Sequence, residues 1–392
     1  MQTGHAARTR PRRRMTALFR PVFRRAHVTA CLAGRLRHSP AMLRSALLAT
    51  GLTVALLLAV VGIVLVPVAL ALPDPAGAIG TFLLGPLDDL RHFGNIVETA
   101  TPLLFTGLSV SLMFRAGMFN LGAEGSFFLG AVFSAFAILE IPLPAWAIAP
   151  AAILFGGAVG STACLIPGLL RARFGASELV SSLMLNYAAL FFGLYVVNYI
   201  LRDPNAGAML SYRFPPAAHL PRLLAGTRIH LGVLIGLAAC ALGAVYLFAT
   251  GWGYEARVVG ANPGFARHLG LKITVVAASV QALGGFIAAM GGAVELQGLY
   301  PRFTWQSLPG QGWNGLVVAI LAGNNPLLVP PAAFALSYLQ VGGDLLARNY
   351  AVPAEVVGLV QALVILFATA TAITRNPRLL RLLAPGRRVD VA

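Results

Sequence analysis

Long apolar runs constrain this chain more than any other feature of its sequence. Such runs recur along the chain, and the first, 47–72, contains no charged residue. A helix of about 20 apolar residues crosses the hydrocarbon core of a bilayer, which is about 30 Å thick. Apolar residues make up 58% of the sequence and charged residues 11%, whereas soluble domains are typically about 25% charged. The chain is therefore predicted to be an all-α, polytopic membrane protein. A β-barrel is disfavoured because its strands alternate polar and apolar residues over about 10 positions.

The apolar runs predict about ten transmembrane helices. They are 47–72, 96–113, 120–139, 146–170, 178–201, 231–250, 273–294, 313–322, 327–341 and 356–373. The eighth is the weakest because it is short. This division gives three regions: an arginine-rich tail (1–44), a transmembrane domain (45–374) with a polar loop at 251–272, and a basic tail (375–392).

The basic residues predict how the chain is oriented. The formal net charge is +16, and 22 of the 29 Lys and Arg residues fall in the two tails or in loops on one side of the proposed membrane. Because Lys and Arg concentrate in cytoplasmic segments, both termini are expected in the cytoplasm, with the spans in the plasma membrane. We interpret the basic residues as orientation signals and contacts with anionic membrane lipids, and no nucleic-acid partner is expected. Of the three cysteines, Cys164 and Cys240 lie in apolar runs, which does not suggest a disulfide framework.

A short turn between the second and third spans carries polar residues beside long apolar stretches. As a helix, the third span would place Asn120 and Glu124 on one face and the small residues Gly122, Ser126 and Gly130 on another. Small residues four apart allow close helix packing in lipid. A carboxylate inside the membrane costs several kcal/mol and is by default a functional candidate, so Glu124 is predicted to line a solute pathway. Two structural alternatives stay open, in which Glu124 stabilises the start of its own helix or pairs with Arg115.

Other polar residues in the spans suit a neutral polar solute. Glu178 and Asn186 lie on the fifth span, and Gln281 lies on the seventh, near Glu295 and Gln297. For Asn186, a hydrogen bond between helices is as good an explanation as a solute contact. The residues predicted to line the pathway are Asn120, Glu124, Glu178, Asn186 and Gln281. The scarcity of ionisable residues in the spans disfavours a proton relay.

The polar loop 251–272 has a helical pattern of its own. Tyr254, Val258, Phe265 and Leu269 keep helical spacing, and the segment Asn262-Pro263-Gly264 interrupts it. Two short amphipathic helices are therefore predicted on the cytoplasmic face. They could lie in the lipid interface or dock into a groove of a protein, and the flanking charges of Glu255 and Arg257 favour the protein.

The sequence does not support an enzyme. It has no His-Glu-x-x-His motif, no paired metal-ligand spacing and no nucleophile elbow, so neither catalytic nor metal-binding residues are proposed. A P-loop needs Gly-Lys-Ser/Thr, and the single lysine is Lys272 in Gly270-Leu271-Lys272-Ile273. Energy from ATP would have to come from a separate ATPase chain.

Four segments of the sequence resemble the permease subunits of bacterial ABC importers for nucleosides and simple sugars, within the branched-chain amino acid and ribose permease family. They are ATPLLFTGLSVSLMFRAGMFNLGAEGSFFLGA, RARFGASELVSSLMLNY, GYEARVVGANPGFARHLGL and WNGLVVAILAGNNPL, and the resemblance runs in order from about residue 96 to 370. It departs from the family at Ser177, where Asn is common, and at Gly323, where a polar or basic residue is usual.

The resemblance implies a set of partners and a role for the polar loop. It implies ABC ATPase subunits that bind ATP, a second permease that is identical or related, and an extracytoplasmic solute-binding lipoprotein, with no cofactor on this chain. The loop would be the coupling segment in the ATPase groove, represented by Tyr254, Glu255, Arg257, Asn262, Phe265 and Leu269. The family core is usually built from two related halves, and a weak echo between 120–130 and 314–323 agrees with this. The alternatives are a permease for branched-chain amino acids, an ion-coupled secondary transporter and a membrane-embedded transferase.

Overall fold

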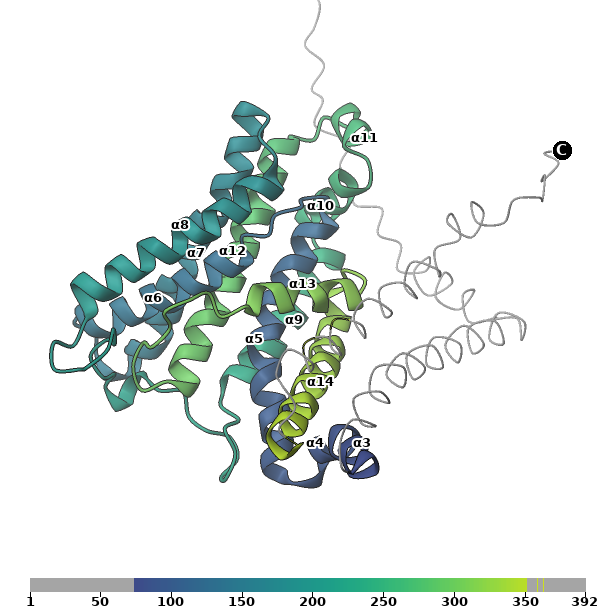
Figure 1. Cartoon of the computed structure of the whole chain (residues 1–392). Helices are drawn as coiled ribbons and strands as arrows, with labels where there is room; N and C mark the ends of the chain where they lie inside the picture. Colours follow the sequence, from purple (N-terminus) through teal and green to yellow (C-terminus); the bar gives the residue numbers. More distant parts are fainter. Residues whose placement is uncertain (1–73, 351–357, 359–361, 363–392) are drawn as a thin grey trace, which may run out of the picture. The chain divides into compact units, whose positions relative to one another are not determined.

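A computed structural model describes residues 74–350, together with residues 358 and 362, and this part of the chain contains helices and no β-sheet. The predicted first span, most of the tenth and both tails lie outside the described residues. The elements are α3 (Pro75–Leu83), α4 (Gly85–Asp88), α5 (Leu90–Arg115), α6 (Ala123–Glu140), α7 (Ala145–Phe174), α8 (Glu178–Val196), η1 (Val197–Leu201), η2 (Pro216–Ala218), α9 (Gly232–Ala249), α10 (Gly251–Ala261), α11 (Pro263–His268), α12 (Ile273–Leu299), α13 (Gln311–Leu321), η3 (Pro326–Leu328) and α14 (Val329–Tyr350) (Figure 1).

Between residues 74 and 350, six helical segments are long and apolar enough to cross a membrane. They are Leu90–Arg115, Ala123–Glu140, Ala145–Phe174, Glu178–Leu201, Gly232–Ala249 and Ile273–Leu299. They match the predicted second to seventh spans, so the all-helical membrane fold is confirmed. The count of about ten, the arrangement in two halves and the position of the termini stay predictions.

The predicted eighth and ninth spans form one bent pair. Helix α13 has 11 residues and is therefore about 16 Å long, roughly half the thickness of the hydrocarbon core. The axis turns by 110° between α13 and the following helical segment, Pro326–Tyr350, which makes the pair a broken span or a re-entrant loop. Gly323 and Asn324 adopt φ values of 59° and 56°, and Pro326 follows, so the helix cannot continue. The prediction of a separate eighth span was wrong.

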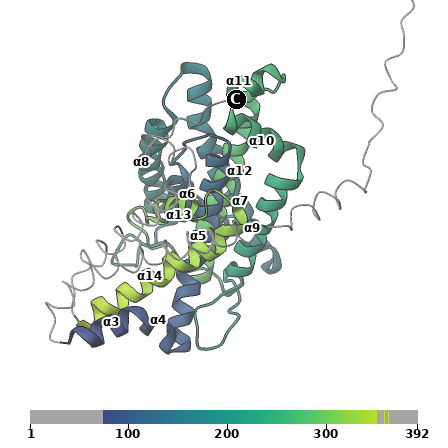
Figure 2. The ribbon, with the colours of Figure 1, turned by 90° about the vertical axis from the view of Figure 1, so that its right-hand side faces the viewer.

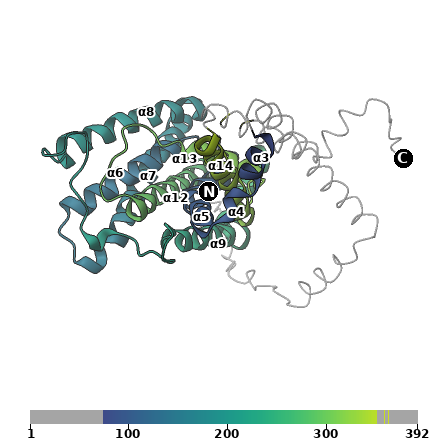
Figure 3. The same ribbon diagram turned by 60° about the horizontal axis from the view of Figure 1, so that its bottom comes forward.

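The short helix α13 lies midway along the bundle. Figures 1 and 2 show it between the end that carries α10 and α11 and the end that carries α3 and α4. Figure 3 shows α8 and α9 on opposite sides of α12 and α13. A helix end at this depth places backbone N–H groups inside the bundle, where they need partners.

Burial separates a central group of helices from a peripheral one. In the apolar stretches of α5 and α6, 83% and 78% of the residues are buried, compared with 33% in those of α7, α8 and α9. The peripheral helices expose apolar side chains, as helices that face lipid do. Helices α5 and α6 therefore form the core that positions the polar residues.

Small residues allow α6, α7 and α12 to approach backbone to backbone. A Cβ added to Gly130 would overlap the backbone of Ala289, and one added to Gly156 would overlap the carbonyl of Gly130. The hydroxyl of Ser126 donates a hydrogen bond to the carbonyl of Gly160 over 3.2 Å. Close packing along the small-residue face of the third span is confirmed.

Candidate functional site

The turn 116–122 brings Asn120 deep into the bundle. Helix α5 ends at Arg115, and Gly117, with φ of 74°, redirects the chain into the turn before α6 begins at Ala123. Asn120 contacts Cys164 and Gln281, which lie about 7 Å along the axis from the midpoints of α7 and α12. Helix α6 therefore starts inside the bundle, three residues later than the sequence pattern indicated.

Three of the predicted pathway residues form one buried hydrogen-bond network. The Asn120 amide donates from Nδ2 to Oε1 of Gln281 over 3.0 Å, and Gln281 donates from Nε2 to Oε1 of Glu178, also over 3.0 Å. Arg171 closes the network through an ion pair of 2.8 Å with Oε2 of Glu178. Asn120 also donates to the carbonyl of Cys164 and accepts from the backbone N–H of Gly122 over 2.7 Å. This buried polar network links the turn with α7, α8 and α12.

Asn186, on α8, is bonded to the same turn from the other side. Its Oδ1 accepts from the N–H of Gly125 over 2.9 Å, and its Nδ2 donates to the carbonyl of Leu121 over 3.1 Å. Ser182, one turn earlier on α8, accepts from the N–H of Leu121 over 3.0 Å. In this conformation Asn186 joins two segments of the protein, which is the structural one of its two proposed roles.

Glu124 binds the start of a helix distant in sequence. Its Oε1 accepts from the N–H of Gly310 over 2.6 Å, and its Oε2 accepts from the N–H of Gly312. These groups belong to the N-terminus of α13, where unpaired N–H groups and the helix dipole favour a negative charge. No Glu124–Arg115 ion pair is present among residues 74–350. The carboxylate thus lies between the N-termini of its own helix and of α13.

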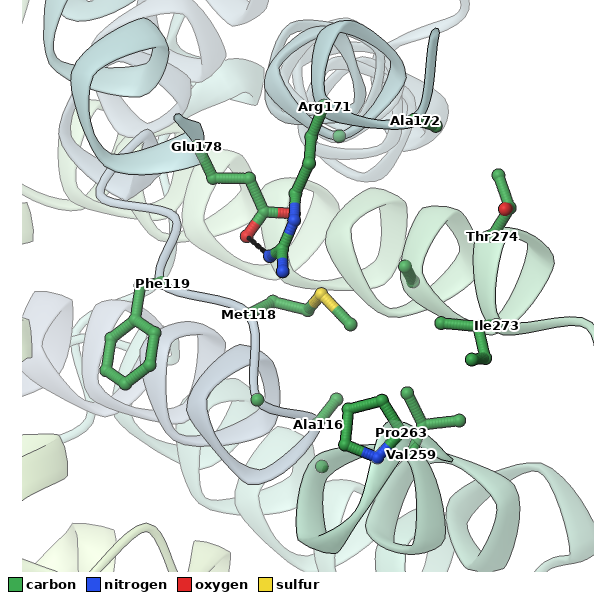
Figure 4. Close-up of a pocket in the computed structure, with 14 residues that line it drawn as sticks. Ala116, Met118, Phe119, Arg171, Ala172, Glu178, Val259, Pro263, Ile273 and Thr274 are labelled. Atoms are coloured by element: carbon green, nitrogen blue, oxygen red, sulfur yellow. Dashed lines mark hydrogen bonds and ion pairs between the residues drawn. The ribbon is translucent and has the colours of Figure 1, made fainter. Parts of the chain in front are cut away.

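A cavity of about 350 Å³ lies between the turn and the segment α10–α11 (Figure 4). Its wall includes Met118 and Phe119 of the turn, the ion pair of Arg171 and Glu178, and Pro263 of α11. The start of α12 supplies Ile273, Thr274 and Ala277. The buried polar network therefore meets this cavity at the Arg171–Glu178 pair.

Residues 251–268 form the two short helices that the loop pattern predicted. The side chain of Asn262 accepts from the N–H of Phe265 over 3.0 Å and so caps α11, while Pro263 occupies its first position. Three apolar side chains of the predicted stripe, Tyr254, Phe265 and Leu269, are 51–54% exposed.

Glu255 and Arg257, the two charged residues predicted to contact the ATPase, are less exposed than the apolar stripe. Val258 packs against a buried cluster instead of extending the stripe, and Glu255 is only partly exposed. The guanidinium of Arg257 lies 5.7 Å from the ring centroid of Phe248, a cation–π distance. Tyr254, Phe265 and Leu269 are therefore more accessible to a partner than Glu255 and Arg257.

The segment α10–α11 touches the turn through main-chain atoms. A Cβ added to Gly260 of α10 would overlap the carbonyl oxygen of Arg115, and one added to Gly117 would lie 3.1 Å from Cα of Gly260. Sequence reasoning missed Gly260, although a small residue within an amphipathic helix is a visible signal of close packing. It also missed Arg171, which lies seven residues before Glu178, at the end of α7 and across the turn that leads to α8.

Comparison with known proteins gives consistent matches. The family model described as "Branched-chain amino acid transport system / permease component" matches residues 93–369. The glucose ABC transporter permease protein TsgB13 of Haloferax volcanii is 34% identical over 331 residues, covering 81% of this chain and 85% of that protein. The nucleoside ABC transporter permease protein NupB of Lactococcus lactis is 30% identical over 309 residues, covering 75% and 83%. The guanosine ABC transporter permease protein NupP of Bacillus subtilis is 29% identical over 290 residues, covering 73% and 83%.

These matches and the membrane-length helices agree. The chain is an integral membrane protein and a transport subunit, not an enzyme, because the matched relatives are permease proteins of ABC transporters. It belongs to the family of branched-chain amino acid transport system permease components.

Proposed function

We propose that this chain is the permease subunit of an ATP-driven ABC importer in the plasma membrane and passes a neutral polar solute, a nucleoside or a simple sugar. The observation that carries the proposal is the main-chain contact between α10 and the turn 116–122. It connects an exposed apolar surface to the polar residues inside the bundle.

The contact between Gly260 and the turn would transmit motion from the exposed surface of α10–α11 to the interior of the bundle. Tyr254, Phe265 and Leu269 form an apolar surface suited to a groove on an ATPase subunit. Because Gly260 lies directly against Arg115 and Ala116, a displacement of α10 must move the turn as well. The same turn carries Asn120, so the displacement reaches the buried polar network within a few residues.

The solute path is proposed to run past Asn120, Glu124, Glu178, Asn186 and Gln281. These residues are bonded to one another or to backbone, so a path along them requires the bonds to part during transport. The cavity beside Arg171 and Glu178 would then be the cytoplasmic end of the path.

The solute class follows from charge and from the relatives. Helix N-termini inside a transporter can bind anionic groups of a substrate, but here Glu124 already occupies the N-terminus of α13. A solute that carries its own carboxylate, such as a branched-chain amino acid, would find the N-terminus of α13 already occupied. The relatives named for guanosine, nucleosides and glucose support an uncharged solute with hydroxyl groups. An ion-coupled secondary transporter finds no support among them.

The proposed partners are those of the transporter class. ATPase subunits would bind and hydrolyse ATP on separate chains, and this chain would hold no cofactor. A second permease, identical or related, and an extracytoplasmic solute-binding lipoprotein would complete the complex.

The proposal is tested by uptake into proteoliposomes that contain the complete complex. We expect ATP-dependent uptake of at least one of guanosine, uridine, D-glucose and D-ribose. Uptake by the purified chain alone, driven only by a proton gradient, would contradict the proposal.

Two sets of variants separate docking from coupling. Tyr254→Ala with Phe265→Ala should abolish co-purification of the ATPase subunits, whereas Leu223→Ala, an exposed apolar residue in the loop before α9, should not. Gly260→Ala should keep the ATPase bound but lower uptake by about tenfold or more, since overpacking costs about 1–3 kcal/mol. Gly251→Ala is the matched control because a Cβ there meets nothing within 4 Å. Equal uptake by the two glycine variants would refute the coupling path.

A further inference from the structure

A second cluster of buried polar groups lies at the opposite end of the bundle from α10 and α11. Glu295 is on α12, one turn after Gly291 and one turn before Gly298. Its side chain is only 6% exposed, and its Oε2 has no hydrogen-bond partner among the described residues. An unpaired buried carboxyl oxygen is costly, and such groups call for an explanation.

His230 supplies an unpaired donor beside this unpaired acceptor. Its Nδ1 accepts from the N–H of Gly232 over 3.1 Å, which places the proton of the neutral ring on Nε2. Burial lowers the pKa of His230 to about 4, so the ring is neutral at physiological pH. Nε2 is buried and has no partner within the described part of the chain, and a Cβ added to Gly298 would overlap the imidazole ring. The His230 ring, with its Nε2–H donor, therefore packs on α12 about one helical turn after Glu295.

Aromatic rings stand next to Glu295 on the same face of α12. The ring of Phe127 lies 3.3 Å from a Cβ placed on Gly291, and it stacks on Trp305 with centroids 5.8 Å apart and an angle of 13°. Tyr300 packs edge-on against Trp305 at 5.6 Å. The ion pair between Glu98 and Arg228, 3.0 Å long, lies at the same end. Trp305 is partly exposed, whereas Phe127, Glu295 and His230 are buried, so a solute would reach the two polar groups only after the rings beside Trp305 move.

We propose that Glu295 and His230 bind two neighbouring hydroxyl groups of the transported solute, with the Phe127–Trp305 pair alongside its ring. One hydroxyl donates to Oε2 of Glu295, and the adjacent hydroxyl accepts from Nε2–H of His230. The ring faces of sugars and nucleobases pack on aromatic side chains. The site rests on the proposed function and specifies its substrate class as solutes that carry a vicinal diol, which ribonucleosides and glucose have and amino acids lack.

A bound water could also bridge the two groups, and the experiment distinguishes a water from a solute. Uptake by the full complex is measured for D-glucose, and for guanosine against 2′,3′-dideoxyguanosine and uridine against 2′,3′-dideoxyuridine, since the dideoxynucleosides lack both neighbouring hydroxyl groups. The binding protein contributes equally to every variant, so a change in the ratio of uptake rates reports on the permease.

Glu295→Met should reduce the preference for the hydroxylated solute by about tenfold, because the hydrogen bond between the solute hydroxyl and the buried carboxyl group is lost. Glu140→Met, at the exposed end of α6, is the matched control and should keep the wild-type ratio. If Glu295→Met fails to assemble, Glu295→Gln keeps the size of the side chain and should still lower the ratio.

Three results would overturn the inference. An unchanged ratio in the Glu295 variants, with uptake by the wild type, would leave the proposed function standing and assign the cluster to water or to structure. An equal change in Glu140→Met would also overturn it. Failure of the wild-type complex to import any of these solutes would overturn both proposals.

Discussion

The two buried polar clusters differ in how completely their hydrogen-bonding groups are used. Around Asn120, the carboxylate and amide groups of Glu178 and Gln281 are paired within the protein. Around Glu295, one acceptor and the Nε2–H of His230 have no partner among the described residues. A saturated cluster stabilises one arrangement of helices, whereas an unsaturated one retains binding capacity. We therefore expect the cluster around Asn120 to couple conformational changes and the cluster around Glu295 to recognise the solute.

The saturated cluster should respond most strongly to loss of one member. Gln281→Met leaves Oε1 of Glu178 buried without its amide partner and removes an acceptor from Asn120, which should lower the free energy of unfolding by about 2–4 kcal/mol. Thermal unfolding of the purified complex measures the change. Gln306→Met, at an exposed position in the loop before α13, is the matched control and should unfold near the wild-type temperature. Equal melting temperatures for the two variants would contradict the structural role.

The same substitution at two buried glutamates tests the comparison directly. Glu124→Gln replaces an acceptor of the α13 N–H groups by a donor and removes the charge, so we expect a loss of about 1–2 kcal/mol of stability together with reduced uptake in an assembled complex. Glu295→Gln removes no hydrogen bond of Oε2 and should leave the melting temperature unchanged or raise it. If both variants lose equal stability, the two clusters do not differ in the way described.

The spans could be predicted because hydropathy is a local property. The runs 231–250 and 273–294 could be interpreted as helices because each is long enough to cross a bilayer of known thickness. The break at Asn262-Pro263-Gly264 could be predicted because proline cannot continue a helix from the preceding residues. The bend after α13 also had a local signal in Gly323-Asn324-Asn325-Pro326. It was interpreted as a loop between two spans, since sequence does not indicate the depth at which a helix ends.

The partners of the polar residues could not be predicted, because they are distant in sequence. Glu124 accepts from residues 186 and 188 positions away, and Asn120 and Gln281 are 161 positions apart. Two local alternatives were considered for Glu124, and the structure shows a third, the cap of another helix. Glu295 was noted in the sequence only as a polar residue near the seventh span, and its lack of a partner is visible only once α5, α12 and the loop 300–310 are packed together.

The smallest expected effect is the pH dependence of the stability, which tests His230 in the cluster around Glu295. The His230 ring lies against Gly298 of α12, one turn after Glu295, and Arg228, which is paired with Glu98 of α5, lies two residues before it. Burial lowers the pKa of His230 from 6.5 to about 4. As the pH falls through 6.5, the unfolded chain takes up a proton at His230 and the folded chain does not, so the folded state loses stability. By linkage the loss of stability between pH 7.5 and pH 6 is about 0.8 kcal/mol, and the loss grows until the folded-state pKa is reached.

Melting temperatures of the wild type and of His230→Asn across this pH range measure the loss. The variant has no titrating group at this position, so its melting temperature should change less with pH. The opposite result would be a wild type that gains stability on acidification relative to His230→Asn. The ring would then be paired with a carboxylate in the folded state, and its Nε2–H would not be free to bind the solute.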